Sequence, residues 1–560
     1  MPSFNLVDEP WLRADSYSPP EAGSEGQTSV QGRPERSLRE LLLDAHRFVG
    51  ISVETPTMVP AVLRQVLLPV VVDALGRPKD AADWRRRFRQ GQFGSEEQDR
   101  LNAYLDEHRH RFDLFDPAVP FGQVADLHTA KGETKGAALL VATAATGNNV
   151  PLFACRSEGD TLALTPAEAS RWLVHAQCWD TAAIKTGVVG DPKAKAGKTT
   201  GNPTGPLGQL GVVVPMGRTL YETLLLNIPL RAGNTPGDKP QWRRDAHGPG
   251  WDQRRAAGLL DLWTWQSRRI RLFPEETADG VRVTRVLIAA GDRLSEVPEC
   301  EPHTTWTLPA AGKSKGGAAP VLRRARRHQP GKAAWRGLEA LLAIDLASFD
   351  PTSKKDGFAT TLLLDQLRGF LDLPHDYPLQ LDLTGIAYGN QSAVVDDIIH
   401  DAIPLPLLAL PADSEVHATL LAVADQAEQL ARAVNNLSAD LRRAAGAEPI
   451  PWDQGHRPGE LVLHALDPVV RRLLVGVRDA GDDEDLLERG CLAWEQLAWR
   501  KTRQVAEHVI RTAAPSTFAG RKVQQGGKEL TYRLGTAETN FRRRLREILP
   551  RAAGARTASS

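Results

Sequence analysis

The sequence predicts an α+β protein with a large mixed N-terminal domain of short strands, residues 1–405, and a C-terminal four-helix bundle, residues 406–560. Three observations predict this organisation. At 560 residues the chain is too long for one hydrophobic core, so two or three domains are expected. In the first 405 residues, short strand-like and helix-like apolar runs alternate with turns that contain Pro and Gly. After residue 405 the apolar positions follow a helical spacing.

Composition excludes several classes of protein. Lys plus Arg equals Asp plus Glu at 69 each, so any nucleic-acid binding must come from local patches. The four cysteines are scattered without a CxxC pair, which argues against a zinc site or a disulfide framework and fits a reducing cytoplasm. The start of the chain has no basic region followed by an apolar core, and no run of about 18 apolar residues occurs. We therefore expect a soluble cytoplasmic protein without a membrane segment, metal or cofactor.

Several helices are predicted in the N-terminal part, among them one at residues 219–227. Ser37 and Glu40 form a capping box that opens the first helix. A second, apolar helix spans about Met58–Leu75 and should bend at Pro69. A third helix covers Pro166–Trp179 and leads into the longest irregular segment of the chain.

That irregular segment, residues 181–211, is basic and rich in glycine. It contains Lys185, Lys193, Lys195 and Lys198 among seven glycines, with Asp191 as its one acid. Glycines let a backbone approach a ligand closely, and unpaired lysines release counterions from phosphates. Two interpretations stay open. One is a nucleic-acid contact centred on Lys185 and Lys198, and the other is a flexible basic surface loop.

Two motifs imitate chemical sites without completing them. Gly197-Lys198-Thr199 resembles the end of a phosphate-binding loop, but Pro192 occupies the position of the required glycine and no clear strand precedes it. The segment 396–401, DDIIHD, resembles a set of hard metal ligands, and on a helix Asp397 and Asp401 would share a face. No second histidine or carboxylate motif completes it, so we interpret the cluster as surface charge or capping. No pattern in the sequence requires an enzyme.

A hairpin tip is predicted late in the N-terminal domain. An alternating apolar run through residues 379–383 and a second run from Ala393 flank the polar turn 388–392, YGNQS. Asn390, Gln391 and Ser392 carry neutral hydrogen-bonding groups that could reach base edges. An ordinary solvated turn is the alternative. Two further strands are predicted upstream, at residues 212–214, where Pro215 should stop the strand, and at residues 263–272.

The C-terminal part predicts helix packing through a heptad spacing. Apolar positions are spaced alternately three and four residues apart at Leu420, Val423, Ala427, Leu430, Val434, Leu437 and Leu441. Three further helices are expected at residues 459–477, 483–512 and 537–549. Together these segments predict the four-helix bundle.

Seven short segments, taken in order, resemble a known family. They are FNLVDEPWL at 4–12, PFGQV at 120–124, TGNNVPLF at 146–153, IKTG at 184–187, TLYETLLLN at 219–227, LWTWQSRRIRL at 262–272 and YGNQSA at 388–393. In this order they resemble the CasA family, the large subunits of the type I-E CRISPR surveillance complex Cascade. The expected C-terminal bundle also fits that family.

The resemblance implies a non-catalytic subunit in antiviral defence. Its expected partners are crRNA, double-stranded target DNA, the other Cascade subunits and a helicase-nuclease. In such complexes the guide RNA reads the target by base pairing, whereas the protein reads a short flanking motif, the PAM, and starts R-loop formation. Wedging a side chain into the duplex costs a few kcal/mol of unstacking, which contacts with bent DNA must offset.

The resemblance also assigns roles to individual residues. Gln391 matches a glutamine that wedges into the duplex, with Asn390 and Ser392 beside it. A glycine-rich loop that reads the motif from the minor groove matches Thr181, Ala182 and Ala183, where the family's glycines are replaced. Arg293 lies near the register of a family lysine that enters the minor groove. Phe153 matches an aromatic residue that touches the 5′ end of the guide.

Two other classes of function remain open on the sequence. One is a nucleotide-binding hydrolase that uses Gly197-Lys198-Thr199, which nucleotide binding to the isolated chain would reveal. The other is a helical scaffold without DNA contact, which would show no dependence on a flanking motif.

Overall fold

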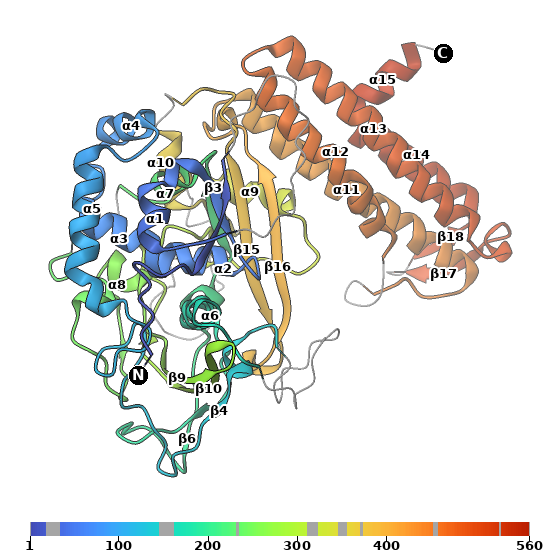
Figure 1. The fold of residues 1–560 in the computed structure, drawn as a ribbon. Coiled ribbons are helices and arrows are strands. Elements are labelled where there is room, and N and C mark those ends of the chain that lie inside the picture. The colour runs from blue at the N-terminus through green and yellow to red at the C-terminus, as the bar shows by residue number, and fades with distance from the viewer. Residues whose placement is uncertain are drawn as a thin grey trace. The chain divides into compact units, whose positions relative to one another are not determined.

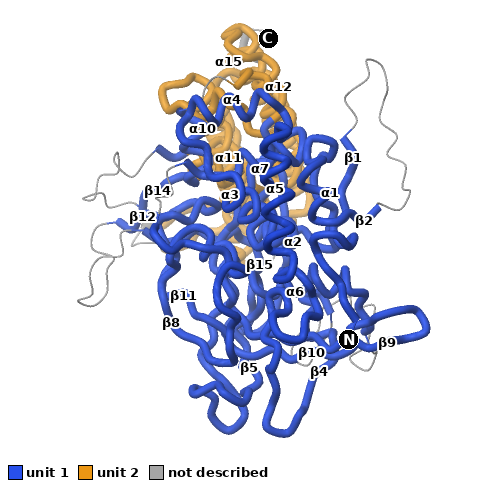
Figure 2. Tube along the Cα trace, turned by 60° about the vertical axis from the view of Figure 1, so that its left-hand side comes forward, with its two compact units in different colours: residues 1–332, 343–372, 379–402 blue, residues 333–342, 373–378, 403–560 orange. Residues whose placement is uncertain are grey.

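The computed structural model describes residues 2–17, 34–144, 162–230, 235–310, 323–344, 356–369, 373–451, 457–525 and 528–558. The chain forms two compact units (Figure 2). Unit 1 comprises residues 1–332, 343–372 and 379–402, and unit 2 comprises residues 333–342, 373–378 and 403–560. The division into separate domains at residue 405 stays a prediction.

Unit 1 mixes short helices with short strands (Figure 1). Its helices are α1 (Leu38–Leu43), α2 (Met58–Val62), α3 (Leu68–Leu75), α4 (Ala81–Gln90), α5 (Ser95–His108), α6 (Pro166–Trp179), α7 (Leu220–Leu226), α8 (Leu259–Trp263) and α10 (Leu362–Arg368). Its first strands are β1 (Leu12–Ser16), β2 (Glu35–Arg36), β3 (Phe48–Ser52), β4 (Lys135–Gly136), β5 (Lys185–Thr186), β6 (Lys198–Thr199), β7 (Val212–Met216) and β8 (Gln253–Arg254). The later strands are β9 (Arg268–Thr277), β10 (Gly280–Ala290), β11 (Arg293–Leu294), β12 (Trp306–Leu308), β13 (Arg324–Ala325), β14 (Gly357–Ala359), β15 (Gln380–Tyr388) and β16 (Val395–Pro404).

The strands form several small sheets in place of one large sheet. The strand orders are β2-β1-β3, β4-β10-β9, β13-β12-β14, β16-β15-β7, β11-β8 and β5-β6. Small sheets beside short helices, followed by a helical unit, are the α+β organisation that the sequence predicted.

The predicted helix at residues 166–179 is α6, a core helix of unit 1. Thr165 accepts the main-chain N–H of Glu168, whose side chain bonds back to Thr165 and completes a capping box. The helix packs against α2, β9 and β10, and Trp172 and Trp179 are buried. The predicted capping box of Ser37 and Glu40 is also confirmed at α1.

The predicted apolar helix at residues 58–75 contains a π-helical turn. The segment Leu63–Leu67 joins α2 to α3, and Pro69, which lacks an N–H, follows that turn. This helix is long and apolar enough to cross a membrane by length and composition, but 83% of it is buried inside the protein. Its buried Arg64 donates to both carboxylate oxygens of Glu301 at 2.7 and 2.8 Å. It is therefore a core helix that carries a paired charge.

The predicted hairpin is confirmed, and it belongs to the sheet β16-β15-β7. Strand β15 pairs with β7 in antiparallel register, with Leu383 opposite Val213 and Leu381 opposite Pro215. Pro215 was expected to stop this strand, but β7 continues to Met216. Proline is tolerated there because β7 is an edge strand whose outer side needs no donor.

The strand predicted over residues 263–272 is wrong in its first half. Trp263 ends helix α8, and Thr264 donates its hydroxyl back to the Leu260 carbonyl at 2.7 Å. The strand starts only at Arg268 and forms the long β9–β10 hairpin. Aromatic and β-branched residues raised the strand signal here, but their tertiary packing stabilises a helix end.

Unit 2 contains the predicted bundle (Figure 1). Its helices are α9 (Leu338–Leu341), α11 (Glu415–Ala445), α12 (Pro458–Ala480), α13 (Glu484–Arg511), α14 (Leu534–Ile548) and α15 (Pro550–Ala558). Helix α11 packs against α12, α13 and α14, and α12 packs against α13. All seven residues of the predicted heptad seam are buried in α11. A hairpin that the sequence analysis missed, β17 (Arg521–Gln525) with β18 (Lys528–Tyr532), lies between α13 and α14 in the chain.

Candidate nucleic-acid interface

The tip of the β15–β16 hairpin is a tight turn closed by main-chain hydrogen bonds. The Ser392 N–H donates to the Gly389 carbonyl at 2.7 Å, and the Gly389 N–H donates to the Val394 carbonyl at 3.0 Å. Gln391 and Ser392 adopt left-handed backbone angles, with φ of 51° and 56°. This conformation is uncommon outside glycine and holds when the surroundings enforce it.

The side chains of Asn390 and Gln391 are exposed at this tip. Within the part of the chain that the structure describes, the Gln391 side chain has no hydrogen-bond partner. A fixed backbone thus presents a free amide, which can both donate and accept hydrogen bonds. That combination suits contact with a neutral polar surface such as a base edge.

The loop after α6 touches this tip directly. The main-chain N–H of Ala182 donates to the Ser392 carbonyl at 2.8 Å. Thr181, Ala182 and Ala183 are half-buried. Two segments that the sequence analysis considered for contact with DNA are therefore neighbours in space.

A buried charge cluster lies under this loop. Arg268, which is 2% exposed, donates to the main-chain carbonyls of Thr181 and Pro203, each at 2.8 Å. The carboxylate of Asp180 accepts from Arg268 and pairs with the ammonium of Lys185. Burial alone would raise the pKa of Asp180, but the charges of Lys185 and Arg268 outweigh it and hold that pKa below its usual value. The cluster is a support for the loop, because each of its three charged groups is ion-paired or hydrogen-bonded within the protein.

A cavity of about 480 Å³ lies beside the tip. Its wall comprises residues from the end of α6, from the segments 135–142 and 183–186, and Ala393 and Val395. His175 in this wall is buried, shares a 2.9 Å hydrogen bond with the Thr57 hydroxyl, and has a pKa lowered by burial to about 3. At neutral pH this histidine is therefore uncharged. Among the described residues, no group of three or more His, Cys, Asp or Glu side chains could hold a metal ion.

The basic segment beyond the loop is ordered around Asp191. Its carboxylate accepts the Thr199 hydroxyl at 2.9 Å and the Trp251 ring N–H at 3.3 Å. Arg293 and Lys193 both lie against the Trp251 ring, 3.8 and 3.9 Å from its centroid. The segment that the sequence analysis interpreted as irregular therefore contains the short β5–β6 hairpin.

Comparisons with known proteins show the family to which the chain belongs. The family model described as "CRISPR-associated protein Cse1" matches residues 5–505. The chain belongs to this family.

A CRISPR-associated protein CasA/Cse1 of Thermus thermophilus is 28% identical over 94% of this chain and 98% of its own. The crystal structure of Cse1 from Acidimicrobium ferrooxidans matches with a TM-score of 0.78 and 31% identity, over 98% of this chain and 99% of that one. The structure of Thermobifida fusca Cse1 matches with a TM-score of 0.77 and the same identity and coverage. A structure described as "CRISPR RNA-guided surveillance complex" shares the fold, with a TM-score of 0.66 and 20% identity over 91% of this chain and 99% of that one.

The two candidate lysines of this Cse1-family chain differ in environment. Lys198 is exposed on β6. Lys185 is 8% exposed and its ammonium is engaged by Asp180, so phosphate contact there would require breaking a buried ion pair. Arg293 is half-buried and donates to the Thr200 carbonyl at 2.8 Å. Phe153 lies outside the described residues. Direct DNA contact by these residues stays a prediction.

Neither imitated motif forms a chemical site. Ala196 and Gly197 have positive φ and form the two-residue turn between the bridged residues Lys195 and Lys198, so Lys198 and Thr199 enter strand β6. A phosphate-binding loop would require a helix at that point, and the hydrolase alternative loses its support. Asp397 and Asp401 lie on strand β16, which corrects the helical placement considered for them.

Sequence reasoning missed Asp180, Arg268 and Tyr388 as parts of this interface. Tyr388 was assigned to the turn, yet its phenol donates to the Trp179 carbonyl at 2.6 Å. No local sequence pattern predicted these contacts, because the partner residues lie far away in the chain. The features of the sequence that could have indicated them were an acid directly after α6 and a run of arginines in a buried strand.

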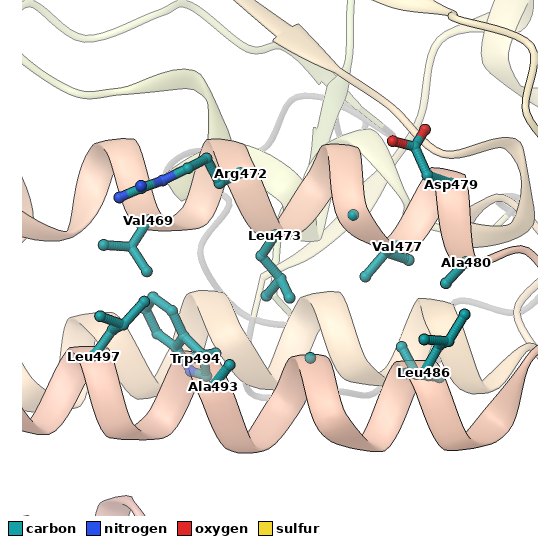
Figure 3. Close-up of a pocket in the computed structure, with 13 residues that line it drawn as sticks. Val469, Arg472, Leu473, Val477, Asp479, Ala480, Leu486, Ala493, Trp494 and Leu497 are labelled. Carbon is teal, nitrogen blue, oxygen red and sulfur yellow. The ribbon is translucent and has the colours of Figure 1, made fainter.

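Unit 2 carries a second surface feature, an apolar groove of about 500 Å³ between α12 and α13. Figure 3 shows Val469, Leu473 and Val477 of α12 pointing toward Leu486, Trp494 and Leu497 of α13. The small residues Gly476, Ala480, Gly490 and Ala493 also line it. Leu486 is 42% exposed, so part of the groove wall is open to solvent.

Proposed function

We propose that this chain is the non-catalytic large subunit of a cytoplasmic type I-E CRISPR RNA-guided surveillance complex. In this role it reads the protospacer-adjacent motif in double-stranded DNA and starts strand separation. Its partners are crRNA, the other Cascade subunits and the helicase-nuclease. Family membership over nearly the whole length of its relatives supports this assignment, as does the shared fold of a structure described as such a complex.

The observation that carries the DNA-opening role is the exposed Gln391 amide on a turn fastened to the loop 181–183. A wedge must keep its position while it displaces a base pair, so its backbone must resist rotation. The main-chain hydrogen bonds within the turn and the one from Ala182 to Ser392 provide that resistance. Asn390 and Ser392 would contact the neighbouring sugar or base edges.

Motif reading is assigned to the loop 181–183 with Arg293 and Lys198 nearby. The loop lacks the family's glycines, so we expect its backbone to approach the minor groove less closely than in relatives that retain them. Lys198 is exposed and would contact phosphate, while Lys185 would act by supporting the loop. Phe153 is assigned to the guide RNA from family resemblance alone.

The Gln391→Ala variant tests the wedge in the assembled complex. A neutral side chain adds little electrostatic attraction, so salt-dependent initial binding should be unchanged. Opening of closed duplex should be weakened by about 1–3 kcal/mol, the scale of an unstacking step. The defect should largely disappear on duplex that is already open beside the motif, because the unstacking cost has been met. Stopped-flow fluorescence of 2-aminopurine at the first target base pair measures this.

Gln524→Ala is the matched control, because Gln524 is an exposed glutamine on β17. It should behave like the unmodified complex on both substrates. Equal Gln391→Ala defects on closed and opened DNA would refute the wedge and leave Gln391 as a plain contact or folding residue. A normal Gln391→Ala complex would make the turn an ordinary solvated one.

Recruitment of the helicase-nuclease is assigned to the bundle, with the α12–α13 groove as its docking site. The groove is apolar and opens near an acidic turn that carries Asp482, Glu484 and Asp485, all exposed. An occupant should therefore be an amphipathic helix with apolar anchors and basic residues at the end that meets the turn. We assign that helix to the helicase-nuclease.

Filling the groove with Ala493→Trp tests this docking site. Loss of one anchor pocket should weaken recruitment by about 2 kcal/mol, or roughly thirtyfold in Kd. Gln504→Trp introduces the same side chain at an exposed position of α13 outside the groove and should have no effect. Binding of labelled helicase-nuclease to the DNA-bound complex is the measurement. Unchanged recruitment by Ala493→Trp would move the docking site elsewhere.

A further inference from the structure

The hairpin tip and the loop after α6 are joined by two hydrogen bonds. The Ala182 N–H donates to the Ser392 carbonyl at 2.8 Å. The Tyr388 phenol donates to the Trp179 carbonyl at 2.6 Å. One bond lies at each side of the tip, so the tip cannot rotate away from the loop without breaking both.

The loop is in turn held by the buried side chain of Arg268, in addition to the ion pair of Lys185 with Asp180. Buried Arg268 donates to the carbonyls of Thr181 and Pro203 and to the carboxylate of Asp180. These bonds tie two segments of unit 1, at residues 180–181 and at Pro203, to one guanidinium. Because the cation is desolvated, releasing any of its acceptors leaves an unpaired buried group.

Two glycines, Gly205 and Gly208, allow the segment 203–208 to pack closely against the end of α6 and against Tyr388, with no free space between them. A Cβ atom on Gly205 would overlap the Cys178 carbonyl at the end of α6. A Cβ atom on Gly208 would overlap the Tyr388 hydroxyl. The segment 203–208 therefore packs directly against the end of α6 and against the Tyr388 phenol.

We propose that residues 180–183 and 388–393 form one rigid unit, the linked loop–tip, which couples motif reading to duplex opening. Tyr388 and Arg268 are its positioning residues, since neither needs to touch DNA. When the loop binds the motif, the tip is held in place with it. Part of the free energy of motif binding can then stabilise the opened base pair at Gln391, because the tip cannot move away while the loop is bound. This inference rests on the proposed function and adds the physical connection between its two steps.

The Tyr388→Phe variant removes the hydrogen bond to the Trp179 carbonyl and keeps the buried aromatic ring. In the assembled complex, opening of closed duplex that carries the preferred motif should slow roughly three- to tenfold, the range for one hydrogen bond. The preferred motif is first selected from duplexes with randomised flanking bases. The advantage of that motif over a random flank should shrink by a similar factor, which a purely structural role for Tyr388 would not produce. The 2-aminopurine assay described for Gln391 measures both quantities.

A double-mutant cycle with Gln391→Ala provides the decisive comparison. If Tyr388 acts through the wedge, Tyr388→Phe should add little to the Gln391→Ala defect in opening. Gly208→Ala presses on the same phenol from the opposite segment and should reproduce the Tyr388→Phe defect. Tyr221→Phe is the matched control, because it removes a buried phenol bonded to the Arg87 carbonyl at 2.8 Å elsewhere in unit 1.

The outcomes separate this inference from the proposed function. If Gln391→Ala is defective but Tyr388→Phe opens duplex normally, the linked loop–tip is overturned and the wedge stands. The same conclusion follows if the opening defects of the two substitutions multiply fully in the double variant. A normal Gln391→Ala complex overturns the wedge, and the coupling with it. An equal loss of opening in Tyr221→Phe also overturns the inference, since any buried phenol would then matter.

Discussion

Burial decides what a lysine does in this protein. Lys185 and Lys198 lie on paired strands of one short hairpin, yet one ammonium is buried against Asp180 and the other is exposed. A buried ion pair contributes to folding and has no counterions to release. An exposed lysine contributes to nucleic-acid binding through counterion release. The same residue type therefore has opposite consequences at the two positions.

We predict that Lys198→Ala lowers the salt slope of duplex binding by about 1, the loss of one phosphate contact. Lys185→Met should leave the slope unchanged and lower the free energy of unfolding by about 1.5–3 kcal/mol, the value of a charged hydrogen bond. Duplex affinity at several salt concentrations and thermal melting are the measurements. A slope that falls in Lys185→Met, or that persists in Lys198→Ala, would reverse the two assignments.

His175 predicts a loss of stability in acid. Burial holds its folded pKa at about 3, below the unfolded value of 6.5. Between these values the unfolded chain binds a proton that the folded chain does not, so stability falls as pH falls through this window. The slope for one such group is about 1.4 kcal/mol per pH unit.

Replacing His175 by Gln removes the titration and keeps a polar side chain beside Thr57. We expect the difference in melting temperature between the unmodified protein and His175→Gln to shrink, or to change sign, as pH falls from 7 to 4. Melting curves at each pH measure it. A constant difference would mean that His175 is protonated in the folded protein.

At the scale of elements, the heptad seam of α11 is the strongest link between pattern and packing. Its apolar residues recur every three or four positions, which places them on one helix face. Helices α12, α13 and α14 cover that face. Asp483 and Ser414 cap the starts of α13 and α11 by accepting main-chain N–H groups at 2.9 and 3.1 Å.

Leu430→Ala should destabilise the bundle by about 2–5 kcal/mol, because Leu430 is fully buried in the seam. Arg432→Ala, at an exposed position of the same helix, should change stability by about 0.5 kcal/mol or less. Urea unfolding followed by circular dichroism compares the two. Equal effects would show that the seam does not carry the bundle's stability.

At the scale of the whole molecule, the two units are expected to divide the work between DNA opening and nuclease recruitment. Deleting residues 406–560 should impair target locking and recruitment while guide-RNA assembly of the other subunits continues. The residues of unit 2 that precede position 406 lose their packing partners in this variant, so its folding must be checked by circular dichroism. Recruitment that survives the deletion would place the docking surface in the first 405 residues.

The sequence by itself determined the elements whose signals are local. Local sequence signals predicted α6, the α11 seam and the β15–β16 hairpin, because hydrogen bonding and side-chain direction within an element depend on near neighbours. Family resemblance then identified the tip that carries Gln391. Only the tertiary structure decided how the parts of the site support one another. Tyr388 and Trp179 are 209 positions apart, and Arg268 holds carbonyls from two other segments. Pairing over such separations depends on the packing of the whole unit, which no local pattern records.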